Sequence, residues 1–171
     1  IICDDGSTND SVSWAEKIVG DDQRVKFISN KKNIGLPATL NHCLKIASGE
    51  YIARMDDDDI SDLTRFEKQM CFIESHPEYD VVGTLANVCD AEDKIWGEYL
   101  LEEFPTKNSF LWNCAILHAT MIAKKESLLA VGGYRVAKET SRYEDYDLFM
   151  RMYAKGMKGY NIQEKLYDYR I

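Results

Sequence analysis

The chain has 171 residues, enough for one domain with a substantial hydrophobic core. It contains 21 Lys and Arg residues against 29 Asp and Glu residues, and its formal net charge at pH 7 is −8. Because proteins bind nucleic-acid phosphates through clustered Lys and Arg, this balance argues against nucleic acid as the main partner. A ligand that carries phosphate would need a metal ion to supply positive charge.

Five cysteines are present, an odd number, and no C-x-x-C pair occurs among them. This pattern is typical of reduced, mostly buried thiols in a cytoplasmic protein. No apolar stretch approaches the ~20 residues that a membrane-spanning helix needs, and no signal peptide is visible. The chain begins without Met at Ile1-Ile2-Cys3, which resembles the end of a buried strand. We therefore expect that an upstream element of the fold is missing from this chain.

Strand-like and helix-like segments alternate in the first half of the chain. In order, we expect a strand at 1–3, a helix at 12–19 ended by Gly20, a strand at 25–29, a helix at 37–47, a strand at 51–55, a helix at 62–75 and a strand at 81–85. Apolar spacing predicts that Ile18 in the first helix and Leu63 and Phe66 in the third face the core. This order, with short connections, predicts an α/β sandwich in which helices cover both faces of a mostly parallel sheet.

The second half is less regular. We expect a hairpin or irregular excursion at 89–101, a short helix at 106–114, a strand at 116–123, a short helix at 125–131, a polar, mobile segment at 136–143, a helix at 144–155, and strands at 158–162 and 166–170. No internal repeat or linker is visible, so we expect residues 1–171 to form a single domain.

Four consecutive aspartates, Asp56-Asp57-Asp58-Asp59, follow the third apolar strand. Two unit charges about 4 Å apart repel by roughly 1 kcal/mol in water and about 4 kcal/mol at an effective dielectric near 20. The run is therefore costly unless it is fully solvated, with Asp59 or Asp62 capping the next helix, or shares a cation. Its place beyond the carboxyl end of a parallel strand, where such sheets bind ligands, favours the cation.

Carboxylate oxygens suit Mg²⁺, Mn²⁺ or Ca²⁺. The calcium-loop pattern is absent because no Gly follows the aspartates. Mg²⁺ or Mn²⁺ held by one or two carboxylates together with substrate phosphates fits better. Asp56 and Asp58 could share such a site if the backbone stays extended, because alternate side chains then point the same way.

A second acidic loop, Asp4-Asp5-Gly6-Ser7-Thr8, follows the first strand and precedes a helix. A helix N-terminus attracts phosphate, but two carboxylates there would repel it. A carboxylate that accepts hydrogen bonds from a nucleobase N–H or from ribose hydroxyls makes better physical sense. Thr8 and Asp10 also suit simple capping of the helix.

Six motifs occur in an order that resembles glycosyltransferase family 2, the inverting nucleotide-sugar transferases. They are Ile1-Ile2-Cys3-Asp4-Asp5-Gly6-Ser7-Thr8, Asn33-Ile34-Gly35-Leu36, Ala53-Arg54-Met55-Asp56-Asp57-Asp58-Asp59, His118-Ala119-Thr120-Met121, Gly132-Gly133-Tyr134 and Glu144-Asp145-Tyr146-Asp147-Leu148. The resemblance spans nearly the whole chain, and Tyr169-Arg170 resembles the end of the family's catalytic domain. It implies a GT-A fold, a Rossmann-type α/β/α sandwich, from which the family's N-terminal strand and following helix are missing here.

The resemblance also implies a donor pocket. Asp5 would contact the uracil or ribose of the donor, with Asp4 in support, and Asn33 and Gly35 would shape the nucleotide pocket. His118 would line the donor or acceptor pocket, although a lone His after an apolar strand is as typical of a packed, hydrogen-bonded residue.

The same resemblance assigns the aspartate run to the donor phosphates and a metal ion. Arg54 would brace the loop, and Asp56 and Asp57 would lie near the ribose and phosphate. Asp58 would be the direct metal ligand, with Asp56 as its partner. Mn²⁺ or Mg²⁺ at that place would stabilise the diphosphate leaving group as a Lewis acid.

Asp145 would be the general base of the transfer, with Glu144 beside it. In-line displacement needs a base on the sugar face opposite the metal, within hydrogen-bond reach of the acceptor hydroxyl. A segment distant in sequence from the aspartate run suits that place. Without the resemblance, the simpler interpretation of Asp145 is a carboxylate stabilised by the dipole of a helix N-terminus.

The resemblance therefore implies an inverting transferase that moves a sugar from a nucleotide diphosphate sugar, a uridine diphosphate sugar in particular, to a saccharide or lipid-linked acceptor. The resemblance further implies cell-surface polysaccharide biosynthesis in the cytoplasm, with peripheral association at the membrane face. Two alternatives stay open. One is a sugar nucleotidyltransferase, although the Gly-rich phosphate loop usual in such enzymes is not visible, and the other is a non-catalytic module that binds a metal or carbohydrate.

Overall fold

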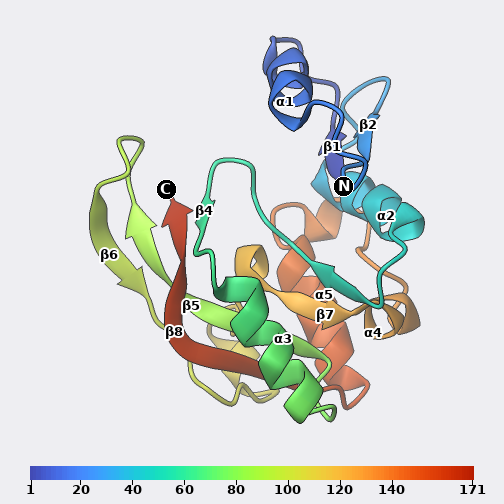
Figure 1. Ribbon diagram of the computed structural model, residues 1–171. Helices are drawn as coiled ribbons and strands as arrows, with labels where there is room; N and C mark the ends of the chain where they lie inside the picture. The colour runs from blue at the N-terminus through green and yellow to red at the C-terminus, as the bar shows by residue number, and fades with distance from the viewer.

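The computed structural model describes residues 1–171, and its centre is a mixed β-sheet with helices on both faces (Figure 1). The strands are β1 (Ile2–Asp4), β2 (Phe27–Ser29), β3 (Tyr51–Ala53), β4 (Ile60–Ser61), β5 (Val81–Cys89), β6 (Ile95–Tyr99), β7 (Ile122–Lys124) and β8 (Gly159–Arg170). The helices are α1 (Ser11–Val19), α2 (Leu36–Ile46), α3 (Arg65–Ser75), α4 (Lys125–Ala130) and α5 (Glu144–Ala154), with 3₁₀ turns η1 (Ser109–Leu111), η2 (His118–Thr120) and η3 (Lys138–Thr140).

Alternation along the central strands builds a core on each face of the sheet. Val81 packs into the large cluster beneath α4 and α5, whereas its neighbour Val82 packs with Ile73 of α3 on the other face. The adjacent pair Ile122 and Ala123 in β7 divides in the same way. Successive side chains of a strand point to opposite faces, so both faces of these strands are covered by helices. The expected α/β/α layering is therefore confirmed.

The strand directions differ from the expected mostly parallel sheet. Within the large sheet, neighbours follow the order β3, β7, β5, β8 and β4, and β6 pairs with β5 beyond the end of β7. Only β5 and β8 pair in parallel there, while the other pairs are antiparallel. The short turn after β5 forces β6 to return antiparallel, which a crossover helix would not. The expected parallel arrangement is seen in β1 and β2, which form a separate two-stranded sheet.

The helices begin and end near the expected residues, but two of them present different faces to the core. Gly20 ends α1 with φ +55° as predicted, yet α1 buries none of its side chains and Ile18 is 79% exposed. In α3, Leu63 and Phe66 are exposed, and the buried face carries Arg65 and Gln69 instead. The Gln69 side-chain Nε2 donates hydrogen bonds to the backbone carbonyls of Val82 and Thr120, at 2.8 Å each. Long-range partners of this kind reverse the face that apolar spacing predicts.

Several expectations for the second half also change. The hairpin at 89–101 is confirmed by β6, but the segment 116–123 contains the turn η2 before the short strand β7. The two expected terminal strands are one continuous strand, β8, whose pairing with β5 is irregular near its middle. The segment 136–143 contains the turn η3, and 106–114 contains only the turn η1. All five thiols are free as expected, but only Cys89 is buried.

The acidic segment between β3 and β4, the carboxyl end of β8 and the small sheet of β1 and β2 all lie toward one end of the molecule, at the top of Figure 1. Both chain termini lie toward that end as well. No helix combines the length and the apolar character that crossing a membrane would need.

Candidate active site

The acidic segment is organised by an ion pair within its own sequence. Arg54 donates Nη1 to Asp56 Oδ2 at 2.6 Å and Nη2 to Asp56 Oδ1, so both carboxylate oxygens are engaged. The side chain of Arg54 is 9% exposed and that of Asp56 is 31% exposed. Burial raises the pKa of Asp56, and the Arg54 cation opposes that rise. The bracing role predicted for Arg54 agrees with this geometry.

The premise that Asp56 and Asp58 share an extended backbone is wrong. Residues 57 and 58 form a turn, so the alternation that would aim the two side chains the same way is lost. Asp57 and Asp58 are exposed, and their carboxylates have no hydrogen-bond or ion-pair partner in the protein. Asp59, by contrast, is buried, so the alternative in which the whole run is solvated and Asp59 caps the next helix is wrong for this residue. Neither Asp59 nor Asp62 caps α3, because Asp62 Oδ1 accepts the N–H of Thr64, two residues on, in the turn before the helix, at 2.8 Å.

The carboxyl end of β8 holds the acidic segment in place. Tyr167 Oη accepts the backbone N–H of Asp56 at 3.2 Å, and Asp59 Oδ1 accepts the backbone N–H of Arg170 at 2.8 Å. Arg170 also donates Nε to the carbonyl of Asp58 at 2.6 Å. Sequence reasoning marked Arg170 only as the end of the domain. These contacts fix the turn at Asp58 while leaving its carboxylate free.

A buried cation lies beneath the same segment. Arg65 is fully buried and donates to Ser61 Oγ at 2.7 Å, to the Thr120 carbonyl at 3.0 Å and to the Arg54 carbonyl at 3.4 Å. Its guanidinium also lies over the ring of Tyr167, 5.1 Å from the centroid. All of its hydrogen-bond acceptors are uncharged, so a positive charge stays uncompensated below the aspartates. Nothing in the sequence marked Arg65 beyond its place in the first turn of the expected helix 62–75.

The first acidic loop is used mainly to shape the chain. Asp4 accepts the backbone N–H groups of Gly6 and Ser7, and these bonds, Ser7 first, lower its pKa. Asp5 accepts the N–H groups of Ile34 at 3.0 Å and Gly35 at 2.9 Å, and the Asn30 amide at 2.9 Å. Asp5 therefore ties this loop to the one before α2.

The residues predicted for the nucleotide pocket surround that junction. Gly35 adopts φ +87° immediately before α2, and Asn33 is exposed with its Oδ1 accepting the Gly35 N–H at 3.1 Å. Neither Thr8 nor Asp10 caps α1, because Asn9 Oδ1 accepts the Ser11 N–H instead. The structure thus brings Asp5, Asn33 and Gly35 together, and their part in a nucleotide pocket stays a prediction.

His118 is packed rather than open. It is 6% exposed, and its Nε2 lies 2.8 Å from Tyr134 Oη. Burial and the Arg54 cation lower the pKa of His118 well below its usual range, so the ring is neutral. Tyr134 is in turn held by Asn41, whose amide bonds both the carbonyl and the N–H of Tyr134 at 2.7 and 2.8 Å. Of the two interpretations left open for His118, this geometry favours the hydrogen-bonded one.

Asp145 and Glu144 begin α5, as the sequence predicts, and both are partly exposed. Asp145 Oδ1 accepts the Tyr146 N–H at 2.7 Å, and the Cys114 thiol lies 3.9 Å from Oδ2. Burial, with the Asp145 carboxylate second, raises the pKa of that thiol to about 12, so it stays protonated and able to donate. Sequence reasoning missed Cys114 because it belongs to no motif.

Two tyrosines, Tyr134 and Tyr169, lie near both Asp145 and the acidic segment. Burial is the main cause of the raised pKa of Tyr169, and the carboxylates of Asp56 and Asp145 both add to it. Burial likewise dominates for Tyr134, whose pKa is also raised by Asp145 and Asp56. Electrostatic coupling of this kind requires proximity. The fold therefore gathers the aspartate run and the start of α5 around one region.

The carboxylates suit a divalent cation only when phosphate oxygens complete its coordination. No group of three or more His, Cys, Asp or Glu side chains is placed to hold a metal by itself. Asp58 and Asp57 are free, whereas Arg54 already occupies Asp56. This donor set fits Mg²⁺ or Mn²⁺, which commonly bind one or two carboxylates and substrate phosphates.

Solved structures confirm the class of fold. The crystal structure of S. aureus TarS 1-349 in complex with UDP-GlcNAc superposes with a TM-score of 0.77 at 19% identity, covering 99% of this chain and 48% of that one. The GT-A architecture of sugar transferases is therefore the architecture of this chain.

Sequence relatives establish the family. The model of glycosyl transferase family 2 matches residues 1–132. The putative glycosyltransferase EpsE of Bacillus subtilis is 40% identical over 171 residues, covering 99% of this chain and 61% of that protein. The UDP-Gal:alpha-D-GlcNAc-diphosphoundecaprenol beta-1,3-galactosyltransferase of Escherichia coli is 29% identical, covering 86% of this chain and 54% of that protein. The chain belongs to glycosyltransferase family 2, and it spans little more than half the length of these two relatives.

Proposed function

We propose that the protein is an inverting glycosyltransferase that moves a sugar from a uridine diphosphate sugar to a hydroxyl of a saccharide or lipid-linked acceptor, in cell-surface polysaccharide biosynthesis. The observation that carries this proposal is that Asp57 and Asp58 keep their carboxylates free on the exposed turn fixed by Arg170, while Glu144 and Asp145 stand partly exposed at the start of α5. The UDP-GlcNAc complex of TarS supports the donor class, and the lipid-linked substrate in the name of the galactosyltransferase supports the acceptor class.

Asp145 is the proposed general base. Its Oδ1 is held by the Tyr146 N–H, and its Oδ2 faces only the weak Cys114 thiol donor at 3.9 Å, which the acceptor hydroxyl would replace when Oδ2 accepts its proton. As that proton leaves, the acceptor oxygen attacks the anomeric carbon from the face opposite the diphosphate. The bond from the anomeric carbon to the diphosphate oxygen breaks, uridine diphosphate departs with the bonding electrons, and the configuration inverts. Glu144, beside Asp145, keeps this face of the site acidic.

The donor end is proposed to lie between the two acidic loops. Asp5 holds the Asn33–Gly35 turn in shape, and Asp4 keeps the preceding loop closed against it. Asp57 lies on the exposed turn where ribose and phosphate are expected. Asp58 is the proposed ligand of Mn²⁺ or Mg²⁺, and Asp56 could join it only by giving up a hydrogen bond from Arg54. Such a cation, when bound with the donor, would stabilise the charge of the leaving diphosphate.

Donor hydrolysis and sugar transfer by the full-length protein, assayed with Mn²⁺ for wild type and single variants, test these roles. Asp145→Asn should lower kcat by about 10²–10⁴-fold while the donor still binds, because only the proton acceptor is lost. Asp58→Ala should instead weaken donor binding and its dependence on metal. Asp21→Asn is the matched control, since Asp21 is exposed and lies outside the site.

Four outcomes would contradict the proposal at different points. Normal turnover by Asp145→Asn would remove the assignment of the base. Failure of every nucleotide sugar to shift the melting temperature, with any metal present, would remove the donor site. Release of pyrophosphate from a nucleoside triphosphate and a sugar phosphate would point to a nucleotidyltransferase, and donor binding without turnover in wild type would point to a binding module.

A further inference from the structure

A short segment of the chain is fastened over the first turn of α5 at two points. The Tyr146 hydroxyl donates to the backbone carbonyl of Phe110, and the Cys114 thiol lies 3.9 Å from Asp145 Oδ2. Phe110 is fully buried and Cys114 is partly buried. Residues 111–113 are therefore held beside the start of the helix that carries the proposed base.

Trp112 stands in the middle of that segment with its side chain in solvent. It is 92% exposed, although both anchored ends of the segment are buried or partly buried. Because a residue spans at most ~3.6 Å, the Trp112 backbone lies within about 7 Å of Cys114, which contacts Asp145. An exposed Trp forgoes the burial of a large apolar surface. A Trp ring that is held this close to the base is suited to contact with a ligand.

Two partly exposed tyrosines lie between this segment and the acidic segment. Tyr99 of β6 and Tyr169 of β8 come from the two strands that flank the end of β5, and their rings lie edge to face with centroids 6.2 Å apart. Burial is the main cause of the raised pKa of Tyr99, and Cys114 and Asp145 add to it. Such coupling requires proximity, so Tyr99 lies close to the anchored segment. We call Trp112, Tyr99 and Tyr169 the aromatic wall.

The charged groups that act on the aromatic wall are mostly carboxylates. Besides burial, which comes first, Asp56, Asp59 and Asp145 all raise the pKa of Tyr169. Arg54, which opposes them, is already paired with both oxygens of Asp56. An anionic sugar would meet this negative charge without a free cation beside it. An uncharged sugar ring, whose C–H face can lie on an aromatic ring, therefore fits the aromatic wall better.

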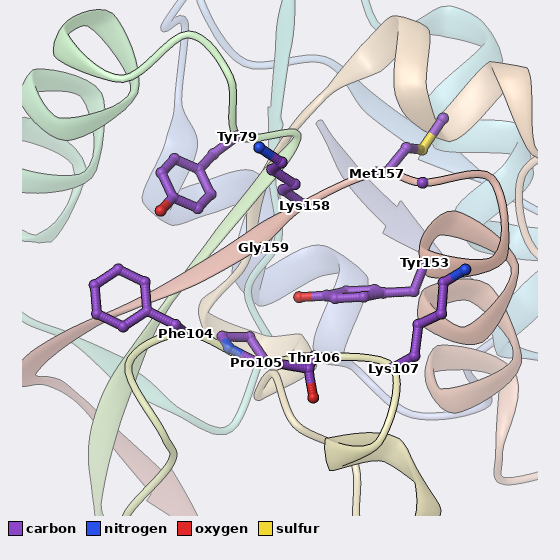
Figure 2. Close-up of a pocket in the computed structure, with 10 residues that line it drawn as sticks. Tyr79, Phe104, Pro105, Thr106, Lys107, Tyr153, Met157, Lys158 and Gly159 are labelled. Carbon is purple, nitrogen blue, oxygen red and sulfur yellow. The ribbon is translucent and has the colours of Figure 1, made fainter.

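A second group of aromatic side chains, at the other end of α5, is too far from the base to serve the same purpose. Figure 2 shows Tyr79, Phe104 and Tyr153 around a cavity of about 290 Å³. Tyr153 follows Asp145 by eight residues, which is roughly 12 Å along the helix at 1.5 Å per residue. A sugar in that cavity could not present a hydroxyl to Asp145.

We propose that the aromatic wall binds the terminal sugar of the acceptor, as an uncharged pyranose ring, and presents one of its hydroxyls to Asp145. The ring would lie against Trp112, with Tyr99 and Tyr169 bordering it on the side of the acidic segment. In a lipid-linked acceptor, the phosphates would then extend away from Asp145, beyond the sugar. This assignment rests on the proposed function, because it takes Asp145 as the base.

Sugar binding is measured on the full-length protein by ¹H–¹⁵N NMR, first without nucleotide and then with uridine diphosphate and Mg²⁺. The neutral probes are the methyl β-glycosides of glucose, galactose and N-acetylglucosamine, and the charged probe is methyl β-D-glucuronide. We expect at least one neutral probe to shift the indole N–H signal of Trp112 and the amides of Tyr99 and Tyr169, with Kd about 10–50 mM. The glucuronide should bind at least about fivefold more weakly.

Variants of Trp112 test the contact without disturbing the fold. Because its side chain is 92% exposed, Trp112→Ala should leave the melting temperature unchanged. It should weaken the tightest neutral probe about tenfold, measured at the Cys114 and Tyr146 amides, whereas Trp112→Tyr keeps an aromatic face and should weaken it about twofold. Trp14→Ala is the matched control, since Trp14 is 64% exposed on α1, and it should leave sugar binding unchanged.

The proposal is overturned if no neutral probe shifts the Trp112 signal at up to about 200 mM in either condition. It is also overturned if the glucuronide binds as tightly as the best neutral probe, or if Trp112→Ala leaves sugar binding unchanged. The donor site is tested separately, by the melting-temperature shift that uridine diphosphate causes with Mn²⁺, and Trp112→Ala should keep that shift. Sugar binding without any such shift would remove the donor site alone, and the shift without sugar binding would remove the aromatic wall alone.

Discussion

The carboxylate of Asp5 should act first as a structural clamp, and replacing it should loosen the loop before α2. Its oxygens accept three hydrogen bonds, from the Ile34 and Gly35 N–H groups and the Asn30 amide. Hydrogen bonds to a charged group contribute about 1.5–3 kcal/mol each when well buried. The donors here are partly exposed and would regain water, so Asp5→Ala should cost only about 2 kcal/mol in all. Asp5→Asn keeps one acceptor and should cost about 1 kcal/mol.

Native-state hydrogen exchange is the sharpest assay for this clamp. A local cost of about 2 kcal/mol should raise the exchange rates of the Ile34 and Gly35 amides by roughly 30-fold in Asp5→Ala. Amides in the core strand β5, such as Val82, should change only as far as global stability does. Asp10→Ala is a control, since Asp10 lies in the same loop and its side chain makes no cap bond. Unchanged exchange at Ile34 and Gly35 would refute the clamp.

The pH dependence of this clamp has a definite sign. Burial pushes the pKa of Asp5 up, but the hydrogen bonds from Ile34, Asn30 and Gly35 outweigh it, so the pKa lies below its ordinary value. A depressed pKa in the folded state stabilises the fold above the unfolded value near ~3.9, and that contribution is lost as pH falls through the folded pKa. The stability difference between wild type and Asp5→Asn should therefore be constant above about pH 5 and shrink below about pH 4.

Two further substitutions test the frame around the site by urea unfolding. Arg54→Met leaves the partly buried Asp56 unpaired and should cost about 2 kcal/mol at pH 7 after allowance for its exposure. Because burial already raises the pKa of Asp56, the cost of Arg54→Met should fall as pH drops through the folded pKa of Asp56. Adding Asp56→Asn to Arg54→Met should remove that cost. A cost that does not change with pH would contradict this reasoning. Gly133→Ala combines φ +69° with a Cβ 2.5 Å from Asn41 Oδ1 and should cost about 2 kcal/mol more than Gly132→Ala, which has φ +81° and open space. If both glycine variants lost the same free energy of unfolding, the Asn41 side chain would have to move away from the new Cβ at no cost.

The order of elements was predictable because local patterns define most of them. Gly20 and Gly35 stand where positive φ values end or begin a helix, and apolar runs mark β3 and β5. The strand directions were not predictable in the second half, because pairing depends on contacts distant in sequence. The long β8, which carries Gln163 and Glu164 in its middle, looked like two strands with a break between them.

The burial of polar residues is the feature of this fold that a single sequence predicts least well. Arg65 and Gln69 are fully buried although both are usually surface residues. Their burial depends on backbone carbonyls of Thr120 and Val82, which no spacing within α3 reveals. Leu63 and Phe66, which apolar spacing predicted to be buried, are therefore displaced to the surface.

The acidic residues of the candidate site divide by whether their oxygens are already engaged. Asp4, Asp5 and Asp59 accept backbone N–H groups, and Asp56 is paired with Arg54. A carboxylate whose bonds hold the fold can bind a substrate only by releasing part of that frame, at a cost of about 1–3 kcal/mol per bond.

The remaining site carboxylates belong to Asp57, Asp58, Glu144 and Asp145. Only Asp145 among them accepts hydrogen bonds, one from the Tyr146 N–H at Oδ1 and a weak one from the Cys114 thiol at Oδ2. Chemistry that needs an oxygen free for a cation or a proton is therefore best assigned to these four. The family resemblance placed these acids, Asp59 excepted, in one site, and the hydrogen bonds separate those that build it from those that can act in it.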